Sequence, residues 1–251
     1  MANLILDDIC VRFGGLQALT DVSFSVKEGE VMGLIGPNGA GKTTVFNVIT
    51  GVYKASSGKV TYDGDTVTGL RPYQVLSMGI ARTFQNIRLF QNMTALENCM
   101  VAQHSRSKVG VVGAILRSPG QRREEQRIQE KSQKALDFMG LGDTTDEVAS
   151  NLPYGHQRRL EIARALASEP QTILLDEPAA GLNPSESMEL MESIGRITEL
   201  GINVLMVEHD MKVVMGICDR IVVLDHGVMI AQGLPEEIQK NPAVIEAYLG
   251  Q

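Results

Sequence analysis

The run GPNGAGKTT at residues 36–44 constrains this chain more than any other feature, because it directly follows the apolar stretch VMGLI at 31–35. The apolar stretch has the character of a buried β-strand, and the residues after the run predict a helix over 42–50. The glycines permit positive φ angles, so successive backbone N–H groups can turn toward one anion. The helix N-terminus adds unpaired amides and a partial positive charge. The run therefore predicts a phosphate-binding loop between a strand and a helix.

Two side chains in this run indicate which phosphate compound binds. Lys42 would place a mobile cation on the β- and γ-phosphates, and the Thr43 hydroxyl would ligate Mg²⁺ beside them. A glycine-rich turn with a surface lysine is the alternative, but the full G-x-x-x-x-G-K-[ST] pattern favours a nucleoside triphosphate site. The residues that we expect around the nucleotide are Gly36, Pro37, Asn38, Gly39, Ala40, Gly41, Lys42, Thr43 and Thr44.

Composition limits the other functions open to the chain. Its 251 residues, 43% of them hydrophobic, suffice for one large domain or for a core with a lobe. No apolar run approaches the ~20 residues that cross a bilayer, and the N-terminus does not resemble a signal peptide, so we expect a cytosolic chain. A net charge of -7 argues against broad binding to nucleic acid or anionic lipid. The 3 cysteines are scattered and indicate no metal or redox site.

Two carboxylates follow the apolar stretch TILL at 172–175. A strand there would deliver Asp176 and Glu177 to the carboxyl edge of a sheet, where open α/β sheets bind ligands. Side chains alternate across a strand, so the two should face differently. Asp176 can hold Mg²⁺ through water, and Glu177 can polarise an attacking water. Alone, the pair would merely solvate a strand end, but beside a phosphate loop it predicts hydrolysis.

A third polar group follows the apolar stretch VLMV at 204–207, where the chain continues as EHD. We expect His209 to donate a hydrogen bond to the γ-phosphate and to orient the attacking water. The alternative is that His209 is only a polar residue at the end of a strand. The preceding pair Asp176 and Glu177 favours a catalytic role for it. His104 and His226 lack such a context and are interpreted as surface residues.

Hydrophobic periodicity predicts an α/β fold with an inserted helical lobe. Alternation at 22–26 and a strand with a turn at 59–64 indicate an antiparallel sheet near the N-terminus. The charged segment 121–139 predicts an amphipathic helix, and the segments 110–113 and 118–120 indicate loops or lobe edges. From residue 172 onward, short apolar runs alternate with helical segments, which favours a parallel sheet. The strands expected there are 172–175, 202–207 and 221–224, and the helices are 185–200 and 211–217.

The order of these motifs resembles that of the ATP-binding subunits of ABC transporters, over essentially the whole chain. The resemblance implies a P-loop NTPase core of residues 1–86 and 166–251, with an antiparallel β subdomain, and an inserted helical subdomain of residues 87–165. It also implies that Phe13 stacks on adenine, where the family usually has Tyr. Gln85 would contact Mg²⁺, take part in catalysis and relay the nucleotide state to the helical lobe. Taken alone, Phe13 would be a packed hairpin aromatic and Gln85 an exposed polar residue.

The family signature is matched by LPYGHQRRLEIARAL at residues 152–166. The resemblance places this segment at a helix N-terminus that meets the γ-phosphate held by a second subunit. It implies a head-to-tail dimer, homomeric or heteromeric, with two ATP molecules at the interface. The usual signature sequence is LSGGQ, so Pro153 and His156 predict weaker contacts between the signature and the nucleotide. In a separate loop, Asn183 stands where the family usually has Asp. The signature residues that would contact the nucleotide are Tyr154, Gly155 and His156.

Smaller motifs resemble one subfamily, the ATPases of high-affinity branched-chain amino-acid importers. The resemblance implies membrane permease subunits, a second ATPase subunit and, through the permeases, a periplasmic solute-binding protein as partners, at the cytoplasmic face of the inner membrane. No nucleic acid is expected. The substrate is inferred by association alone, since none of these residues would touch it. The motifs are RTFQ with NIRLF at 82–90, AAGLNP at 179–184, EHDMK at 208–212, a polar insert between 106 and 133, and NPAVIEAYLG at 241–250.

Three alternatives stay open. A related ABC subunit could serve lipopolysaccharide or another solute, which co-purified membrane partners would reveal. A soluble ABC ATPase acting on ribosomes or DNA usually carries tandem ATPase halves or long coiled-coil inserts, and neither is visible here. A regulatory nucleotide-binding module with little hydrolysis would fit the departures at Pro153 and His156, and a phosphate-release assay would expose it.

Overall fold

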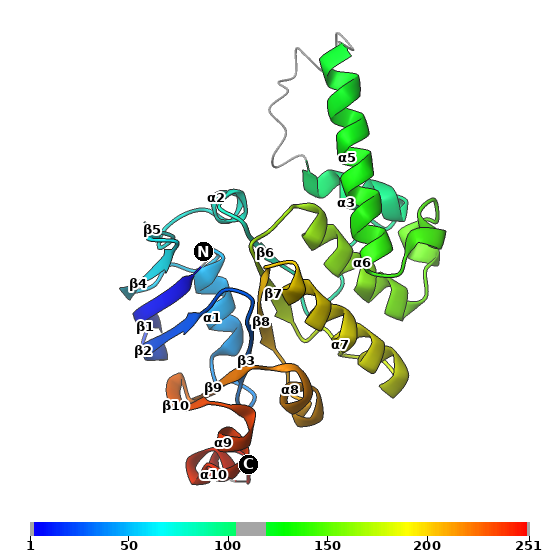
Figure 1. The fold of residues 1–251 in the computed structure, drawn as a ribbon. Helices are drawn as coiled ribbons and strands as arrows, with labels where there is room; N and C mark the ends of the chain where they lie inside the picture. Colours follow the sequence, from blue (N-terminus) through cyan, green and yellow to red (C-terminus); the bar gives the residue numbers. More distant parts are fainter. Residues whose placement is uncertain (1–2, 104–118, 250–251) are drawn as a thin grey trace.

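The computed structural model describes residues 3–103 and 119–249, which form two β-sheets and a helical lobe (Figure 1). A four-stranded antiparallel sheet has the order β2-β1-β4-β5, and a six-stranded sheet has the order β10-β9-β3-β8-β7-β6. The strands are β1 Leu4–Phe13, β2 Leu16–Val26, β3 Val31–Ile35, β4 Ser57–Tyr62, β5 Asp65–Thr66, β6 Ile80–Arg82, β7 Thr172–Asp176, β8 Asn203–Val207, β9 Arg220–Asp225 and β10 Val228–Gly233. The helices are α1 Lys42–Ile49, α2 Pro72–Ser77, α3 Ala95–Gln103, α5 Pro119–Phe138, α6 Tyr154–Ala167, α7 Pro184–Glu199, α8 Met211–Ile217, α9 Pro235–Lys240 and α10 Pro242–Leu249.

The six-stranded sheet lies between two hydrophobic cores. Its strands pair in parallel except for β10, which is antiparallel to β9. Because successive side chains point to opposite faces, Val31 and Ile35 of β3 pack with the helices, whereas Met32 and Leu34 pack with the antiparallel sheet and α1. Cover on both faces explains why β3, β7 and β8 are mostly apolar and buried along their whole length.

The helical lobe is built on α3, α5 and α6, which pack against one another. Figure 1 shows α5 projecting from the body of the molecule, with its C-terminal end beside the other two helices. Buried apolar side chains fill the space between them, among them Cys99, Leu136 and Leu160. The segment after β6 leads from the carboxyl end of the sheet into the lobe, and α6 leads from the lobe back to the start of β7.

The predicted fold class is confirmed, with one local error. The helix expected over 121–139 begins earlier, at Pro119, so Pro119 and Gly120 do not form a loop. Proline is tolerated in the first helical turn because its missing N–H would be unpaired there. The segment 110–113, expected as a loop, and Ser118 lie outside the described residues. The division into 1–86, 87–165 and 166–251 stays a prediction.

No helix in the described part of the chain is long and apolar enough to cross a membrane.

Candidate functional site

The phosphate loop joins the end of β3 to the start of α1, and its glycines adopt conformations that other residues avoid. Gly36, Gly39 and Gly41 have φ angles of 145°, 79° and 104°. A Cβ atom on Gly36 would lie 2.0 Å from the Leu224 carbonyl oxygen, and one on Gly41 would lie 2.7 Å from a Leu19 methyl carbon. Both glycines are therefore required by backbone angle and by space.

Lys42, the first residue of α1, folds back over this loop. Its Nζ donates to the carbonyl oxygens of Gly36 at 2.6 Å and Pro37 at 2.9 Å. Burial lowers the pKa of Lys42, and the charges of Glu177 and Asp176 act in the opposite direction. The two predicted carboxylates thus lie close enough to act on this ammonium group, which is poised to bind an anion on the loop.

Asp176, the last residue of β7, forms a buried ion pair that sequence reasoning missed. Its Oδ2 lies 2.9 Å from Nη2 of Arg82 at the end of β6, and both side chains are less than one-tenth exposed. Arg82 also donates to Asn47 Oδ1 of α1 at 2.7 Å. Its guanidinium stacks near the rings of Phe46 and Phe84. Arg82 therefore fixes the position of Asp176 relative to the helix that follows the phosphate loop.

Gln85, Glu177 and His209 come together from three separate segments. Gln85 Nε2 donates to Glu177 Oε2 at 2.9 Å, and His209 Nδ1 lies 3.7 Å from the same oxygen. The φ angle of Glu177 is 50°, a left-handed conformation that is rare for a residue with a side chain. Its amide donates to the Val207 carbonyl at 2.9 Å, which ties the end of β7 to the end of β8. The arrangement holds one carboxylate between an amide and an imidazole.

Glu208 is a second residue that sequence reasoning left without a role. It is 1% exposed; its Oε1 accepts the Ala179 N–H at 2.9 Å and its Oε2 accepts the His209 N–H at 3.2 Å. Burial raises the pKa of Glu208, and these two backbone hydrogen bonds oppose the shift. A carboxylate directly after an apolar strand was the available signal. Glu208 fixes the loop after Glu177 relative to the backbone of His209.

The signature residues lie at the N-terminus of α6, opposite the loop at 179–182. Tyr154 donates from its hydroxyl to the Ala180 carbonyl at 3.1 Å. A Cβ atom on Gly155 would lie 2.9 Å from Glu186 Oε1 of α7, so this glycine permits a close approach. His156 Nδ1 is buried without a hydrogen-bond partner among the described residues. Pro153 is the N-cap of α6 and gives it no side-chain hydrogen bond.

The remaining predicted positions are Phe13, Asn183 and the two histidines that were expected at the surface. Phe13, at the end of β1, is 44% exposed and packs edge-to-face on Tyr53, with ring centroids 5.1 Å apart. Tyr53 follows α1 and was not predicted. Asn183 caps α7: its Oδ1 accepts the Glu186 N–H at 3.0 Å, so its side chain has a structural role. The His226 side chain is 93% exposed, as expected, and His104 lies outside the described residues.

Comparisons with known proteins agree with this geometry. A family model described as ABC transporter matches residues 19–180, and one described as branched-chain amino acid ATP-binding cassette transporter matches residues 228–251. LivG of Salmonella typhimurium, a high-affinity branched-chain amino acid transport ATP-binding protein, is 48% identical over 99% of this chain and 98% of its own. BraF of Pseudomonas aeruginosa, which carries the same description, is 45% identical over the same shares. A solved ATP-binding cassette of an ABC transporter in its ADP conformation is similar with a TM-score of 0.87 at 33% identity, and both chains are covered completely. The chain therefore belongs to the ABC transporter family, as one of its ATP-binding subunits.

Proposed function

We propose that this chain hydrolyses ATP to power an importer of branched-chain amino acids. The observation that carries the catalytic part is the meeting of Gln85, Glu177 and His209 at strand ends close to Lys42. The match of residues 228–251 to the branched-chain family model, and the descriptions of the relatives, support the substrate class. The roles proposed for the site residues concern the nucleotide and not the solute.

Lys42 would exchange the carbonyl oxygens of the loop for β- and γ-phosphate oxygens, because its ammonium group already lies over the loop. Glu177 would take a proton from the attacking water as the general base. Gln85 orients that carboxylate through its hydrogen bond, and His209 can turn its largely exposed imidazole toward the γ-phosphate. Loop amides, the N-terminus of α1 and the Lys42 ammonium would stabilise the charge that develops.

Mg²⁺ fits the donors of this site. Thr43, Asp176 and Gln85 offer hydroxyl, carboxylate and amide oxygens, which are the hard ligands that this ion prefers. Within the described ranges, no group of three or more His, Cys, Asp and Glu gathers into a metal cage. Mg²⁺ commonly binds through one or two protein oxygens, phosphates and waters, so this donor set suits an ion that arrives with the nucleotide. When bound, it would neutralise charge on the β- and γ-phosphates.

The proposed nucleotide site is completed by a second ATPase subunit. The N-terminus of α6, with Tyr154, Gly155 and His156, would face the γ-phosphate bound to that subunit, and Phe13 would stack on adenine within this chain. We further propose that the pair docks on membrane permease subunits at the cytoplasmic face of the inner membrane. A periplasmic solute-binding protein would then act through the permeases.

The test of the catalytic proposal is the variant Glu177→Gln. It should leave Mg-ATP binding, measured by calorimetry, within about twofold, while phosphate release falls at least about 100-fold because the general base is lost. Glu199→Gln, at the exposed end of α7, is the matched control and should keep the full rate. An undiminished rate in Glu177→Gln would refute its assignment as the base.

The substrate class needs a separate experiment. Co-expression of the chain with its membrane partners, purification of the complex and reconstitution in vesicles allow uptake of labelled leucine to be compared with that of unrelated solutes. ATP-dependent leucine uptake that is abolished by Glu177→Gln supports the proposal. ATP-dependent uptake of only another solute would assign the subunit to a different importer.

A further inference from the structure

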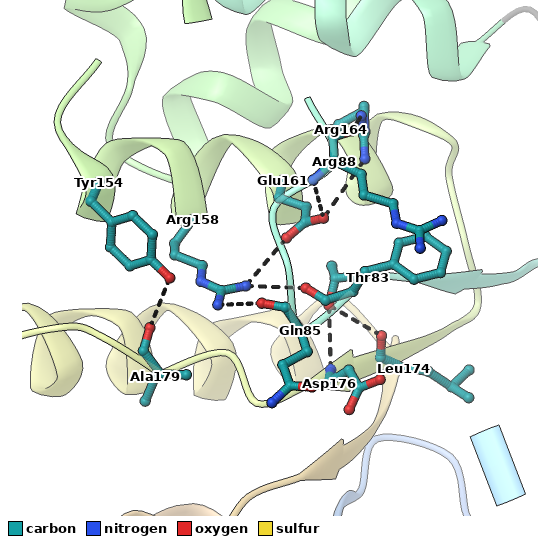
Figure 2. Close-up of polar contacts among 12 residues, drawn as sticks. Thr83, Gln85, Arg88, Tyr154, Arg158, Glu161, Arg164, Leu174, Asp176 and Ala179 are labelled. Atoms are coloured by element: carbon teal, nitrogen blue, oxygen red, sulfur yellow. Dashed lines mark hydrogen bonds and ion pairs between the residues drawn. The ribbon is translucent and has the colours of Figure 1, made fainter. Parts of the chain in front are cut away.

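The backbone around Gln85 is hydrogen-bonded to side chains of one helix, α6. Arg158 of α6 donates from Nη1 to the Phe84 carbonyl at 3.1 Å and from Nη2 to the Gln85 carbonyl at 2.5 Å, as Figure 2 shows. A single planar guanidinium thus binds two successive carbonyl groups. The side chain of Gln85 points away from Arg158 in Figure 2. Its Nε2 donates to Glu177.

Two more residues on the same side of α6 extend this grip. Glu161 accepts the N–H of Arg88 at 3.3 Å, and Arg164 donates to the Arg88 carbonyl. Glu161 also lies between the two arginines, with a carboxylate oxygen 3.6 Å from Arg158 Nη1 and another 3.9 Å from Arg164 Nη2. We call Arg158, Glu161 and Arg164 the α6 clamp. It satisfies three carbonyls and one amide in residues 84–88.

The α6 clamp brings charge into the protein interior. Arg158 is 4% exposed and Glu161 is 2% exposed. Burying a charge destabilises the folded state unless the charge is paired and hydrogen-bonded. Replacing a buried ion pair with apolar side chains of similar size often leaves the stability unchanged or raises it. Apolar side chains could fill the same space, but they could not hold the backbone of residues 84–88 in one register. The hydrogen bonds of the clamp therefore indicate that it orients the backbone of residues 84–88 relative to α6.

The same helix reaches the other side of Glu177. Tyr154, at the start of α6, donates to the Ala180 carbonyl in the loop that follows Glu177, and the Arg158 guanidinium lies 5.5 Å from the Tyr154 ring centroid. Figure 2 shows Arg158 between Tyr154 and the backbone of Gln85. Both segments that flank the Glu177 carboxylate are thus attached to one rigid element.

We propose that Arg158 is a positioning residue for ATP hydrolysis. By fixing the backbone of residues 84–88 to α6, the clamp sets where the Gln85 side chain meets Glu177, and so couples the orientation of the signature helix to that of the carboxylate. The inference rests on the proposed roles of Gln85 and Glu177.

The test uses the full-length chain with Mg-ATP and the variant Arg158→Lys. Lysine keeps a positive charge near Glu161 but cannot contact both carbonyls as a fork. The kcat should fall about 10- to 100-fold, with the KM for ATP within about twofold, because misplacement affects the reacting geometry more than nucleotide binding. Lys131→Gln is the control: it removes an ion pair between α5 and Glu169, which follows α6, and should keep the full kcat.

A double-mutant cycle with Gln85→Ala separates positioning from a general effect on the fold. If Arg158 acts through Gln85, Arg158→Lys should lower kcat by less than about twofold in the Gln85→Ala background. An equal loss in both backgrounds, or an unchanged kcat in Arg158→Lys alone, overturns the proposal. Should Arg158→Lys fail to fold, the pair Arg158→Met/Glu161→Met removes both charges and enters the same cycle. Full activity in Glu177→Gln would instead refute the proposed base, and the cycle between positions 158 and 85 would still report their coupling.

Discussion

Replacing Arg82 with methionine should destabilise the protein strongly, because it leaves the Asp176 carboxylate buried without its cation. The two side chains are 8% and 7% exposed, and their charged atoms lie 2.9 Å apart. Removing one partner of a buried pair costs about 3–5 kcal/mol. The variant also loses the hydrogen bond to Asn47 and the stacking on Phe46 and Phe84. We therefore expect the free energy of unfolding to fall by about 4 kcal/mol or more.

Urea unfolding followed by circular dichroism, without nucleotide, measures this change. Arg82→Lys keeps the charge but not the planar fork, and should lose only about 1–2 kcal/mol. The double variant Arg82→Met/Asp176→Asn removes the uncompensated charge and should recover part of the loss. A loss below about 1 kcal/mol in Arg82→Met, with an unchanged urea slope, would refute the reasoning. Such a result would mean that water stabilises the Asp176 carboxylate about as strongly as Arg82 does.

Two further predictions concern residues beside the site. Asn183→Ala should lower the free energy of unfolding by about 1 kcal/mol because α7 loses its N-cap, whereas Asn183→Asp should stay close to the parent protein in thermal unfolding. Burial raises the pKa of Glu208, so its carboxylate is protonated at a higher pH in the folded protein than in the unfolded chain. Burying the ionised carboxylate destabilises the folded state, and this destabilisation decreases as the pH drops. The parent should therefore gain stability relative to Glu208→Gln between about pH 7 and pH 5 in urea titrations, and parallel curves would contradict this.

The parts of the site that could be predicted are those set by local sequence. Gly36 and Gly41 predicted the shape of the phosphate loop because positive φ angles and close backbone approach leave little choice of residue. Carboxylates after the apolar run 172–175 predicted a polar sheet edge because parallel strands present their carboxyl ends together. The alternation of strands and helices likewise predicted the α/β class. The start of α5 at Pro119 differs from the prediction, because Ser-Pro-Gly is typical of loops whereas proline is also tolerated in the first helical turn.

The sequence by itself determined the phosphate loop, the apolar strands β3, β7, β8 and β9 and the polar residues at their ends, since these depend on residues that are neighbours in the chain. Only the tertiary structure decided which polar groups meet. Arg82 pairs with Asp176 across 94 positions, and Arg158 reaches the Gln85 carbonyl across 73. Such pairs are buried, and the free energy of a buried charge depends on the distance and geometry of its partner, which no local pattern encodes.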